Sequence, residues 1–223
     1  MGRLIVLEGT DGSGKSTQMG LLTERLDRAG VQFRRLVFPR YSEPSSTLIR
    51  MYLGGEFGSH PDDVNAYAAS TFYAVDRYAS YKQDWGTYYE SGGLLVADRY
   101  TTSNVVHQAP KLSGNARREF LTWLYDLEYT KMGLPEPDLV IYLDMPTELS
   151  EKLMRRREEK THTTADIHEQ DAQYLAHCRA AARDAAEASG WRIVSCAKDG
   201  ELRPARDIHE EIYALVRGYV EGN

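Results

Sequence analysis

Apolar residues along this chain fall into two alternating patterns. Five short runs are almost wholly apolar, as is typical of strands buried on both faces; they are residues 4–7, 36–38, 94–97, 139–143 and 191–194. Between them, apolar residues recur every three or four positions, which is the spacing of one face of a helix. This spacing predicts helices at residues 19–29, 62–85, 113–131, 166–189 and 208–219. Pro146 is placed to open one more helix.

The alternation of strands and helices predicts the fold class. Strands connected through helices pair in parallel and are covered on both faces, so we expect a three-layer α/β fold around a five-stranded parallel sheet. Sheets of this kind bind ligands at the carboxyl ends of their strands. Residues 155–165 contain only one apolar side chain, an alanine, and predict a short mobile loop.

Composition and charge narrow the possible functions. A chain of 223 residues with 42% hydrophobic side chains suits one domain over residues 1–223. The formal charge, 27 − 33 = −6, opposes binding to a polyanion. No apolar run approaches the roughly 20 residues of a membrane span, and no signal peptide is expected. Cys178 and Cys196 lack metal-site or redox-pair spacing, so we expect reduced packing cysteines. We expect a cytoplasmic protein with no nucleic-acid or membrane partner.

A phosphate-binding loop follows the first predicted strand. Residues 9–16 read GTDGSGKS and fit the pattern G-x-x-x-x-G-K-[ST] between a strand and a helix. Glycines let backbone N–H groups approach a phosphate closely, while Lys15 supplies a charge at the β- and γ-phosphates. The motif predicts ATP as co-substrate, Mg²⁺ as cofactor with Ser16 as a ligand, and an ATP site that comprises Gly12, Ser13, Gly14, Lys15, Ser16 and Thr17.

Cationic residues follow two further strands and indicate a kinase. Residues 38–41 read FPRY, and Asp98 and Arg99 end the third predicted strand. A kinase needs cations that cancel charge on the transferred phosphoryl group. Arg40 and Arg99 are expected to project into one crevice, and Asp98 is placed to hold the metal or its water. The guanine-reading tetrapeptide N-K-x-D is absent, which disfavours a GTPase.

The motif set resembles one family. GTDGSGKST, FPRY, FYAVDR, DRYTTSN and DIHE occur in the order and approximate spacing of thymidylate kinases, from residue 3 to about residue 175. The resemblance implies ATP and dTMP as substrates and a homodimer that contacts through helices near residues 62–85 and 113–131. It also implies an acceptor site, expected to comprise Asp11, Phe38, Arg40, Tyr41, Tyr73, Arg77, Arg99, Ser103, Asn104, His107 and His168.

Particular roles within that site are also implied by the resemblance. Tyr73 is expected to stack on the base, with Phe72 as the alternative, and Arg77 to bond a thymine carbonyl. Asp11 is expected to bond the sugar 3′-hydroxyl. His107 and His168 stand where the family usually has tyrosines, one of which lies against the sugar and disfavours a 2′-hydroxyl. A differently built discrimination against ribose is therefore expected.

A basic run precedes the predicted mobile loop. Members of the family that have glycine after the P-loop aspartate supply a catalytic cation from the lid, and this chain has Gly12. The resemblance therefore implies a lid at about residues 155–168. Arg155 and Arg157 are expected to act with Lys15 and Arg99 in catalysis, and Arg156 to contact ATP.

The function expected is phosphoryl transfer from ATP to dTMP, giving dTDP and ADP. An alternative is a kinase for another nucleoside monophosphate or for a deoxynucleoside. A nucleoside kinase needs a carboxylate base near the acceptor hydroxyl, and Glu43 is the residue that would support it. A third alternative is an ATP-binding module without turnover.

Overall fold

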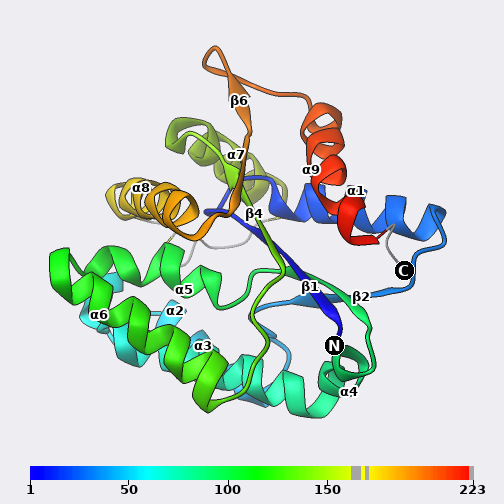
Figure 1. Cartoon of the computed structure of the whole chain (residues 1–223). Helices are drawn as coiled ribbons and strands as arrows, with labels where there is room; N and C mark the ends of the chain where they lie inside the picture. Colours follow the sequence, from blue (N-terminus) through cyan, green and yellow to red (C-terminus); the bar gives the residue numbers. More distant parts are fainter. Residues whose placement is uncertain (162–166, 169–170, 221–223) are drawn as a thin grey trace.

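Five parallel strands form the centre of the protein. The computed structural model describes residues 1–161, 167–168 and 171–220. The strands are β1 (Arg3–Glu8), β2 (Phe33–Val37), β3 (Leu94–Asp98), β4 (Leu139–Asp144) and β5 (Arg192–Ser195). Their order is β2-β3-β1-β4-β5, and every pairing is parallel (Figure 1). The prediction of a five-stranded parallel sheet is confirmed. The order in which the chain adds strands to the sheet switches direction beside β1. Folds of this kind bind ligands at such a switch point.

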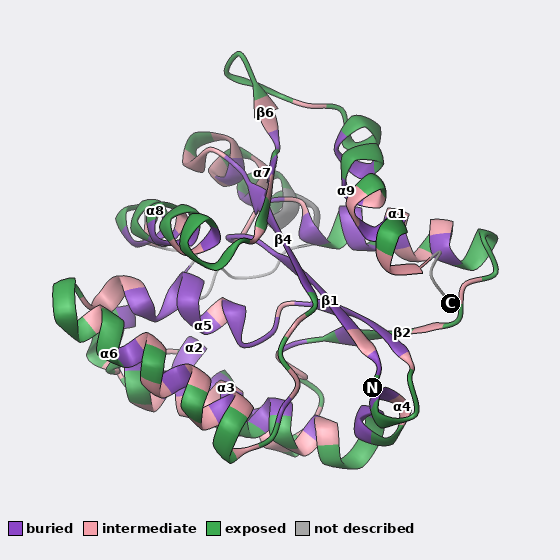
Figure 2. Ribbon diagram, in the orientation of Figure 1, coloured by how far each residue is buried: buried purple, intermediate pink, exposed green. Residues whose placement is uncertain are grey.

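Helices cover both faces of this sheet (Figure 1). Side chains of a strand alternate between its two faces. Ile5 and Leu7 pack with α1 (Lys15–Arg28), α7 (Thr147–Thr161) and α9 (Ala205–Val220) in one core cluster. Leu4 and Val6 belong to a second cluster on the opposite face, which contains residues of the π-helical turn Tyr81–Trp85 and of α4 (Gly86–Glu90). Strands β1, β3 and β4 are almost wholly buried, whereas the edge strands β2 and β5 are partly exposed (Figure 2).

The helical layer near β3 consists of more pieces than the sequence predicted. The helix expected at residues 62–85 is a 3-10 turn (Pro61–Asp63), α3 (Ala66–Ser80) and the π-helical turn. Asn65 separates the first two pieces, because its side chain accepts a hydrogen bond from Ala68 N at 2.9 Å and caps α3. The helix expected at 113–131 is α6 (Gly114–Tyr125) and a π-helical turn (Asp126–Lys131).

Several short elements were not predicted. They are 3-10 turns at Pro44–Ser46 and Ala109–Lys111, α2 (Thr47–Leu53), α5 (Thr102–His107), and a hairpin of β6 (Ala197–Lys198) with β7 (Glu201–Leu202). These elements carry too few residues for a periodic signal. No helix within the described ranges has both the length and the hydropathy that a membrane crossing requires.

The predicted lid loop is wrong over its first half. Helix α7 continues through residue 161, so residues 155–161 are helical. Arginine, glutamate and lysine are good helix formers, so a polar stretch without apolar periodicity can still be helical. Helix α8 (Ala172–Ser189) begins six residues later than expected, because Asp171 caps it by accepting from Tyr174 N at 2.9 Å. Residues 162–166 lie outside the described part of the chain.

Candidate active site

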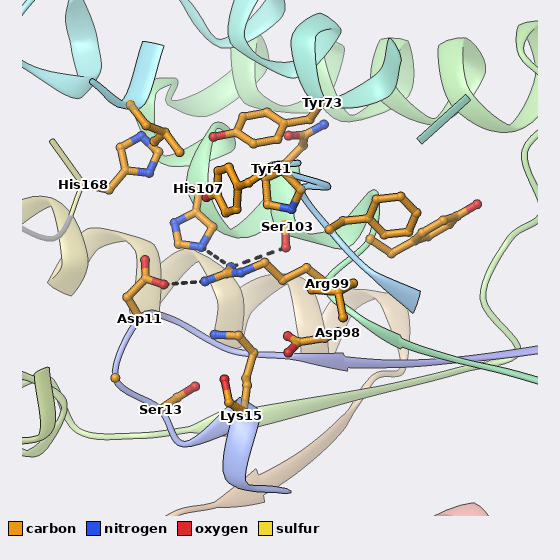
Figure 3. A pocket seen from close by; sticks show the side chains of 18 of the residues that line it. Asp11, Ser13, Lys15, Tyr41, Tyr73, Asp98, Arg99, Ser103, His107 and His168 are labelled. Atoms are coloured by element: carbon orange, nitrogen blue, oxygen red, sulfur yellow. Dashed lines mark hydrogen bonds and ion pairs between the residues drawn. The ribbon is translucent and has the colours of Figure 1, made fainter. Parts of the chain in front are cut away.

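A cavity of about 600 Å³ lies at the carboxyl ends of β1, β2 and β3. Its walls come from the loop before α1, the segment after β2, helices α3 and α5, and His168 (Figure 3). Most residues that the sequence predicted for the two substrate sites line this one cavity. They are Asp11, Gly12, Ser13, Gly14, Lys15, Ser16, Thr17, Phe38, Tyr41, Tyr73, Arg77, Asp98, Arg99, Ser103, Asn104, His107 and His168.

The phosphate-binding loop is shaped by its glycines. Gly14 has a φ of 88° and directly precedes Lys15, the first residue of α1. The left-handed conformation is open to glycine and strained for other residues. Lys15 Nζ donates to the carbonyl oxygens of Gly9 (2.7 Å) and Thr10 (3.0 Å). Burial, helped by the nearby charge of Arg99, lowers the pKa of Lys15 to about 8.

Gly12 brings the loop against helix α7. Its φ is 74°, and a Cβ atom there would lie 2.5 Å from the carbonyl oxygen of Ser150 and 2.9 Å from Cγ of Met154. Leu153 and Met154 line the cavity, and the exposed Arg155 and Arg156 follow them on the same helix. The glycine therefore allows close packing between the phosphate-binding loop and the helix that carries the predicted lid arginines.

Arg99 lies at the centre of the cavity (Figure 3). It directly follows β3 with a φ of 68°, a conformation uncommon outside glycine, and its N–H donates to Leu7 O at 3.1 Å. Its Nη2 donates to Asp11 Oδ1 at 2.5 Å, and its Nη1 lies 3.7 Å from Glu8 Oε1. These carboxylates keep Arg99 cationic: burial opposes the charge, but Asp11 and Glu8 raise the pKa of Arg99 overall.

Asp11 is held as a carboxylate by the same charges. Burial would raise the pKa of Asp11, but Arg99 and Lys15 lower it well below its ordinary value. Asp11 and Arg99 therefore form an ion pair that bridges the phosphate-binding loop and the end of β3. An incoming phosphate would compete with Asp11 for the guanidinium.

His107 and His168 lie beside this ion pair as stacked, neutral rings. Their centroids are 5.7 Å apart and their planes differ by 17°. Arg99 Nη1 donates to His107 Nε2 at 2.9 Å. Burial lowers the pKa of His168 to about 4 and, together with Arg99, the pKa of His107 well below its ordinary value. Because a guanidinium only donates, neutral His107 carries its proton on Nδ1.

The other end of the cavity is lined by Tyr73, Arg77 and Asn104. Arg77 is buried and forms an ion pair with Glu128. Only the N–H groups of Arg77 that do not bind Glu128 can donate to a ligand. Phe72, the alternative to Tyr73, does not line the cavity; it packs against the cluster around Ile49 and Tyr52.

Arg40 does not join Arg99 on the cavity wall. Asp76 on α3 accepts from Arg40 N at 2.9 Å and lies 3.6 Å from Arg40 Nε. Arg40 Nη2 donates to Ser45 Oγ at 3.3 Å. In this conformation Arg99 lines the cavity and Arg40 does not, because Asp76 attracts Arg40; the expectation that both arginines act in one crevice stays a prediction. Glu43 is also absent from the wall.

The lid arginines are not among the lining residues. Arg155 and Arg156 are exposed on α7, and the side chain of Arg157 lies outside what the structure describes. His168 and its neighbour Ile167, by contrast, lie at the end of the predicted lid and are buried. Ile167 N donates to Leu53 O at 3.4 Å, which holds this end of the lid segment against α2.

Sequence reasoning missed three buried polar residues around the cavity. Glu8 accepts from Gly9 N (3.0 Å), Thr102 Oγ1 (2.8 Å) and Ser103 Oγ (2.8 Å). Gln108 lines the cavity with an amide that has no partner in the described part of the chain. Glu128 pairs with Arg77. An acid that ends an apolar strand, as Glu8 does, was a usable signal; Gln108 and Glu128 gave none.

Asp98 and Ser16 are the residues that fit a metal ion. Both line the cavity, and Asp98 makes no side-chain hydrogen bond to another described residue. Carboxylate and hydroxyl oxygens suit Mg²⁺, which takes its remaining ligands from phosphates and water. Among the described residues there is no group of three His, Cys, Asp or Glu side chains that would hold a metal by themselves.

Comparisons with known proteins agree on one family. A family model described as thymidylate kinase matches residues 7–212. The thymidylate kinase of Mycobacterium tuberculosis strain H37Rv is 32% identical over 190 residues, which are 84% of this chain and 87% of that protein. A probable thymidylate kinase of Pyrobaculum aerophilum is 28% identical over 215 residues, which are 96% of this chain and 97% of that protein.

A solved structure shows the same fold. The structure of a thymidylate kinase from Candida albicans superposes with a TM-score of 0.71 at 21% sequence identity. The match covers 97% of this chain and 92% of that chain.

The contact between Gly12 and α7 can be tested by adding one methyl group. We expect Gly12→Ala to lower ATP affinity at least about tenfold and the free energy of unfolding by roughly 1–2 kcal/mol, because the loop and α7 must separate. Gly20→Ala is the matched control: it meets nothing within 4 Å and should stabilise α1 by about 0.5–1 kcal/mol. Calorimetric titration and denaturant unfolding measure both quantities. Unchanged ATP affinity in Gly12→Ala would contradict the contact.

The lowered pKa of Lys15 predicts proton uptake on ATP binding. Lys15 is cationic below pH 8 and increasingly neutral above it, whereas bound phosphates favour the cation. ATP affinity should therefore fall as pH rises above about 8, by up to about tenfold per unit. At pH 8.5, titration calorimetry in buffers of different ionisation enthalpy should detect protons taken up by the complex. Lys15→Met should lose this uptake; uptake retained in that variant would assign it to another group.

Proposed function

This chain belongs to the thymidylate kinase family, and on that premise we propose that it transfers the γ-phosphoryl group of ATP to dTMP, giving ADP and dTDP. The observation that supports the proposal most is the layout of the cavity. The phosphate-binding loop lines one end, Arg99 lies at the centre, and Tyr73, Arg77 and Asn104 line the other end (Figure 3). One cavity therefore offers both an anion site and an aromatic, hydrogen-bonding site for a base.

The proposed reaction is an in-line displacement without a protein nucleophile. The acceptor phosphate oxygen attacks the γ-phosphorus while the bond to the β-phosphate bridging oxygen breaks, and ADP leaves. Lys15 binds the donor phosphates, and Arg99 neutralises charge on the transferred group and on the acceptor. Backbone N–H groups of Gly12, Ser13 and Gly14 bind donor phosphate oxygens, and Ser16 and Thr17 complete the donor site.

We propose Mg²⁺ as the metal of this reaction, held by Asp98 and Ser16. When bound, Mg²⁺ would supply charge neutralisation on the phosphate oxygens of the donor. The contribution of the chain is to orient these two oxygen ligands beside Lys15 and to limit the access of water. The buried position of Asp98 supports this role.

At the acceptor, we propose that Tyr73 stacks on the base and that Arg77, Asn104 and Ser103 contact the nucleotide. Phe38 and Tyr41 line the wall next to it. Asp11 is positioned to bond a sugar hydroxyl once the acceptor phosphate takes over Arg99. To reach that phosphate, the side chain of Arg40 would have to rotate away from Asp76. This side chain is 17% accessible.

His107 and His168 form the neutral wall beside the sugar in this proposal. Two imidazoles accept or donate single hydrogen bonds, whereas tyrosine would add bulk and a hydroxyl. We propose that they set the preference between deoxyribose and ribose.

We also propose a single domain over residues 1–223 with a lid at about 155–168. The close packing of Gly12 on α7 supports the lid, because it brings the helix that bears Arg155, Arg156 and Arg157 next to the donor phosphates. In this role Arg155 and Arg157 would add charge to the transition state and Arg156 would contact ATP.

Two further expectations remain proposals. A homodimer is supported by an exposed stripe on α3, where Tyr67, Val75 and Tyr78 lie at helical spacing with 37%, 45% and 38% of their surfaces accessible. A cytoplasmic location stays a prediction from the sequence.

A substrate panel tests the proposed reaction. ADP release should be measured with ATP, Mg²⁺ and, in turn, dTMP, dUMP, UMP, dCMP, dAMP and thymidine. We expect the highest kcat/KM with dTMP, and at least about a hundredfold lower kcat in Lys15→Met because the donor phosphates lose their charge partner. Faster turnover of thymidine would indicate a deoxynucleoside kinase, and ATP binding without any turnover would indicate a binding module.

The lid is tested by alanine substitution of Arg155, Arg156 and Arg157 one at a time. At least one variant should lower kcat tenfold or more, equivalent to about 1.4 kcal/mol of transition-state stabilisation. Lys152→Ala is the control, because Lys152 is an exposed cation on the same helix. The lid proposal fails when all three variants keep kcat within twofold of the parent.

A further inference from the structure

A fully buried carboxylate lies behind the base end of the cavity. Glu128 accepts from Arg77 Nε (2.6 Å) and Arg77 Nη2 (2.6 Å), from Thr101 Oγ1 (2.7 Å) and from Asn104 Nδ2 (3.3 Å). Each carboxylate oxygen thus receives two hydrogen bonds. Arg77 and Asn104 both line the cavity, whereas Glu128 does not. One acid therefore anchors two ligand-facing side chains from behind.

This anchoring fixes the orientation of the Asn104 amide. A carboxylate only accepts hydrogen bonds, so the NH₂ group and not Oδ1 must face Glu128. The same NH₂ group also donates to Ser70 O at 3.4 Å, another atom that only accepts. Asn104 Oδ1 accepts no hydrogen bond within the described part of the chain, and it is the polar atom of Asn104 left for a ligand.

The anchoring also limits what Arg77 can offer. A guanidinium has five N–H bonds. Within the part of the chain that the structure describes, three of them are used, two on Glu128 and one on Tyr100 O at 3.3 Å, which leaves two. The base end of the cavity therefore presents a donor from Arg77 next to an acceptor from Asn104.

We propose that Glu128 is a positioning residue that selects the pyrimidine: by holding Arg77 as donor and Asn104 as acceptor, it favours thymine and uracil over cytosine. Thymine and uracil present O4, an acceptor, beside N3–H, a donor, which is the complement of that pair. Cytosine presents the reverse, an N4 amino donor beside an unprotonated N3 acceptor. Cytosine would therefore set donor against donor and acceptor against acceptor.

The backbone conformation around Glu128 supports a positioning role for this residue. It lies in the π-helical turn Asp126–Lys131, which interrupts the regular register after α6. Such insertions rotate the following side chains and occur frequently at functional sites. Here the turn carries Glu128 to the interior while its neighbour Asp126 stays exposed.

The inference rests on the proposed dTMP kinase activity, and the test is the selectivity between bases. In Glu128→Gln an amide NH₂ replaces one accepting oxygen, so the Asn104 amide can turn over. We expect kcat/KM for dTMP to fall at least about tenfold, mainly through KM, while kcat/KM for dCMP falls less or rises. The ratio of dTMP to dCMP turnover should fall at least about tenfold, with KM for ATP within about twofold of the parent.

Two further variants make the result decisive. Asp126→Asn removes an exposed carboxylate from the same turn and should change neither the ratio nor either KM. Thr101→Val removes one hydrogen bond to Glu128 but leaves both ligand-facing groups, and should lower the ratio about threefold. If circular dichroism shows that Glu128→Gln does not fold, the ratio of dTMP to dCMP turnover in Thr101→Val tests the inference instead.

Each outcome has a defined meaning. An unchanged ratio in the folded Glu128→Gln variant, or in Thr101→Val when the former does not fold, overturns the inference. A uniform loss for all acceptors and for ATP assigns Glu128 a purely structural role and also overturns it. A parent enzyme without dTMP turnover contradicts the proposed function itself, whereas an active parent whose variants keep its selectivity contradicts only the role of Glu128.

Discussion

The site is organised around one partly buried cation, the guanidinium of Arg99, whose side chain is 17% accessible. It lies between Asp11 of the phosphate-binding loop, at 2.5 Å, and Glu8 at the end of β1, at 3.7 Å. A buried arginine without carboxylates would be strongly destabilising, because desolvation of an unpaired charge costs several kcal/mol. The same carboxylates hold the guanidinium between the phosphate-binding loop and the end of β1. The sharp turn at Arg99, with its positive φ, is the backbone distortion that makes this placement possible.

Acids, most of them buried, orient each of the arginines predicted for the acceptor side. Asp76 holds Arg40, Glu128 holds Arg77, and Glu8 with Asp11 holds Arg99. A long flexible side chain loses about 2 kcal/mol of conformational freedom when it is fixed, and a paired acid fixes it before the ligand arrives. The geometry of the pairs differs with the expected task. Arg77 has two short bonds to one acid, which suits the recognition of a fixed base edge, whereas Arg40 makes one loose contact and remains able to turn.

The residues at the carboxyl ends of the strands could be predicted from the sequence, whereas most of the acids that pair with the arginines could not. The positions of the strands and the phosphate-binding motif follow from short-range patterns, so the cavity wall from Asp11 to Thr17 and around Arg99 could be anticipated. The partners Asp76 and Glu128 could not, because they lie 36 and 51 positions away from their arginines in the sequence, and nothing around either acid indicates the pairing. Glu8, which ends an apolar strand, was the one supporting acid with a usable signal. The helical state of residues 155–161 was missed for a different reason, since charged helix formers resemble loops when no apolar stripe accompanies them.

The charged residues of the cavity and the residues proposed to select the base lie in different parts of it. Lys15, Asp11, Arg99 and Asp98 gather between the phosphate-binding loop and the centre of the cavity, where the charges of Lys15, Asp11 and Arg99 shift one another's pKa values. The stacked pair of His107 and His168 comes next and is neutral, because burial and the neighbouring cation lower the pKa of both rings. In the proposed function, base recognition depends on the direction of single hydrogen bonds at Arg77 and Asn104, which nearby unpaired charges would override.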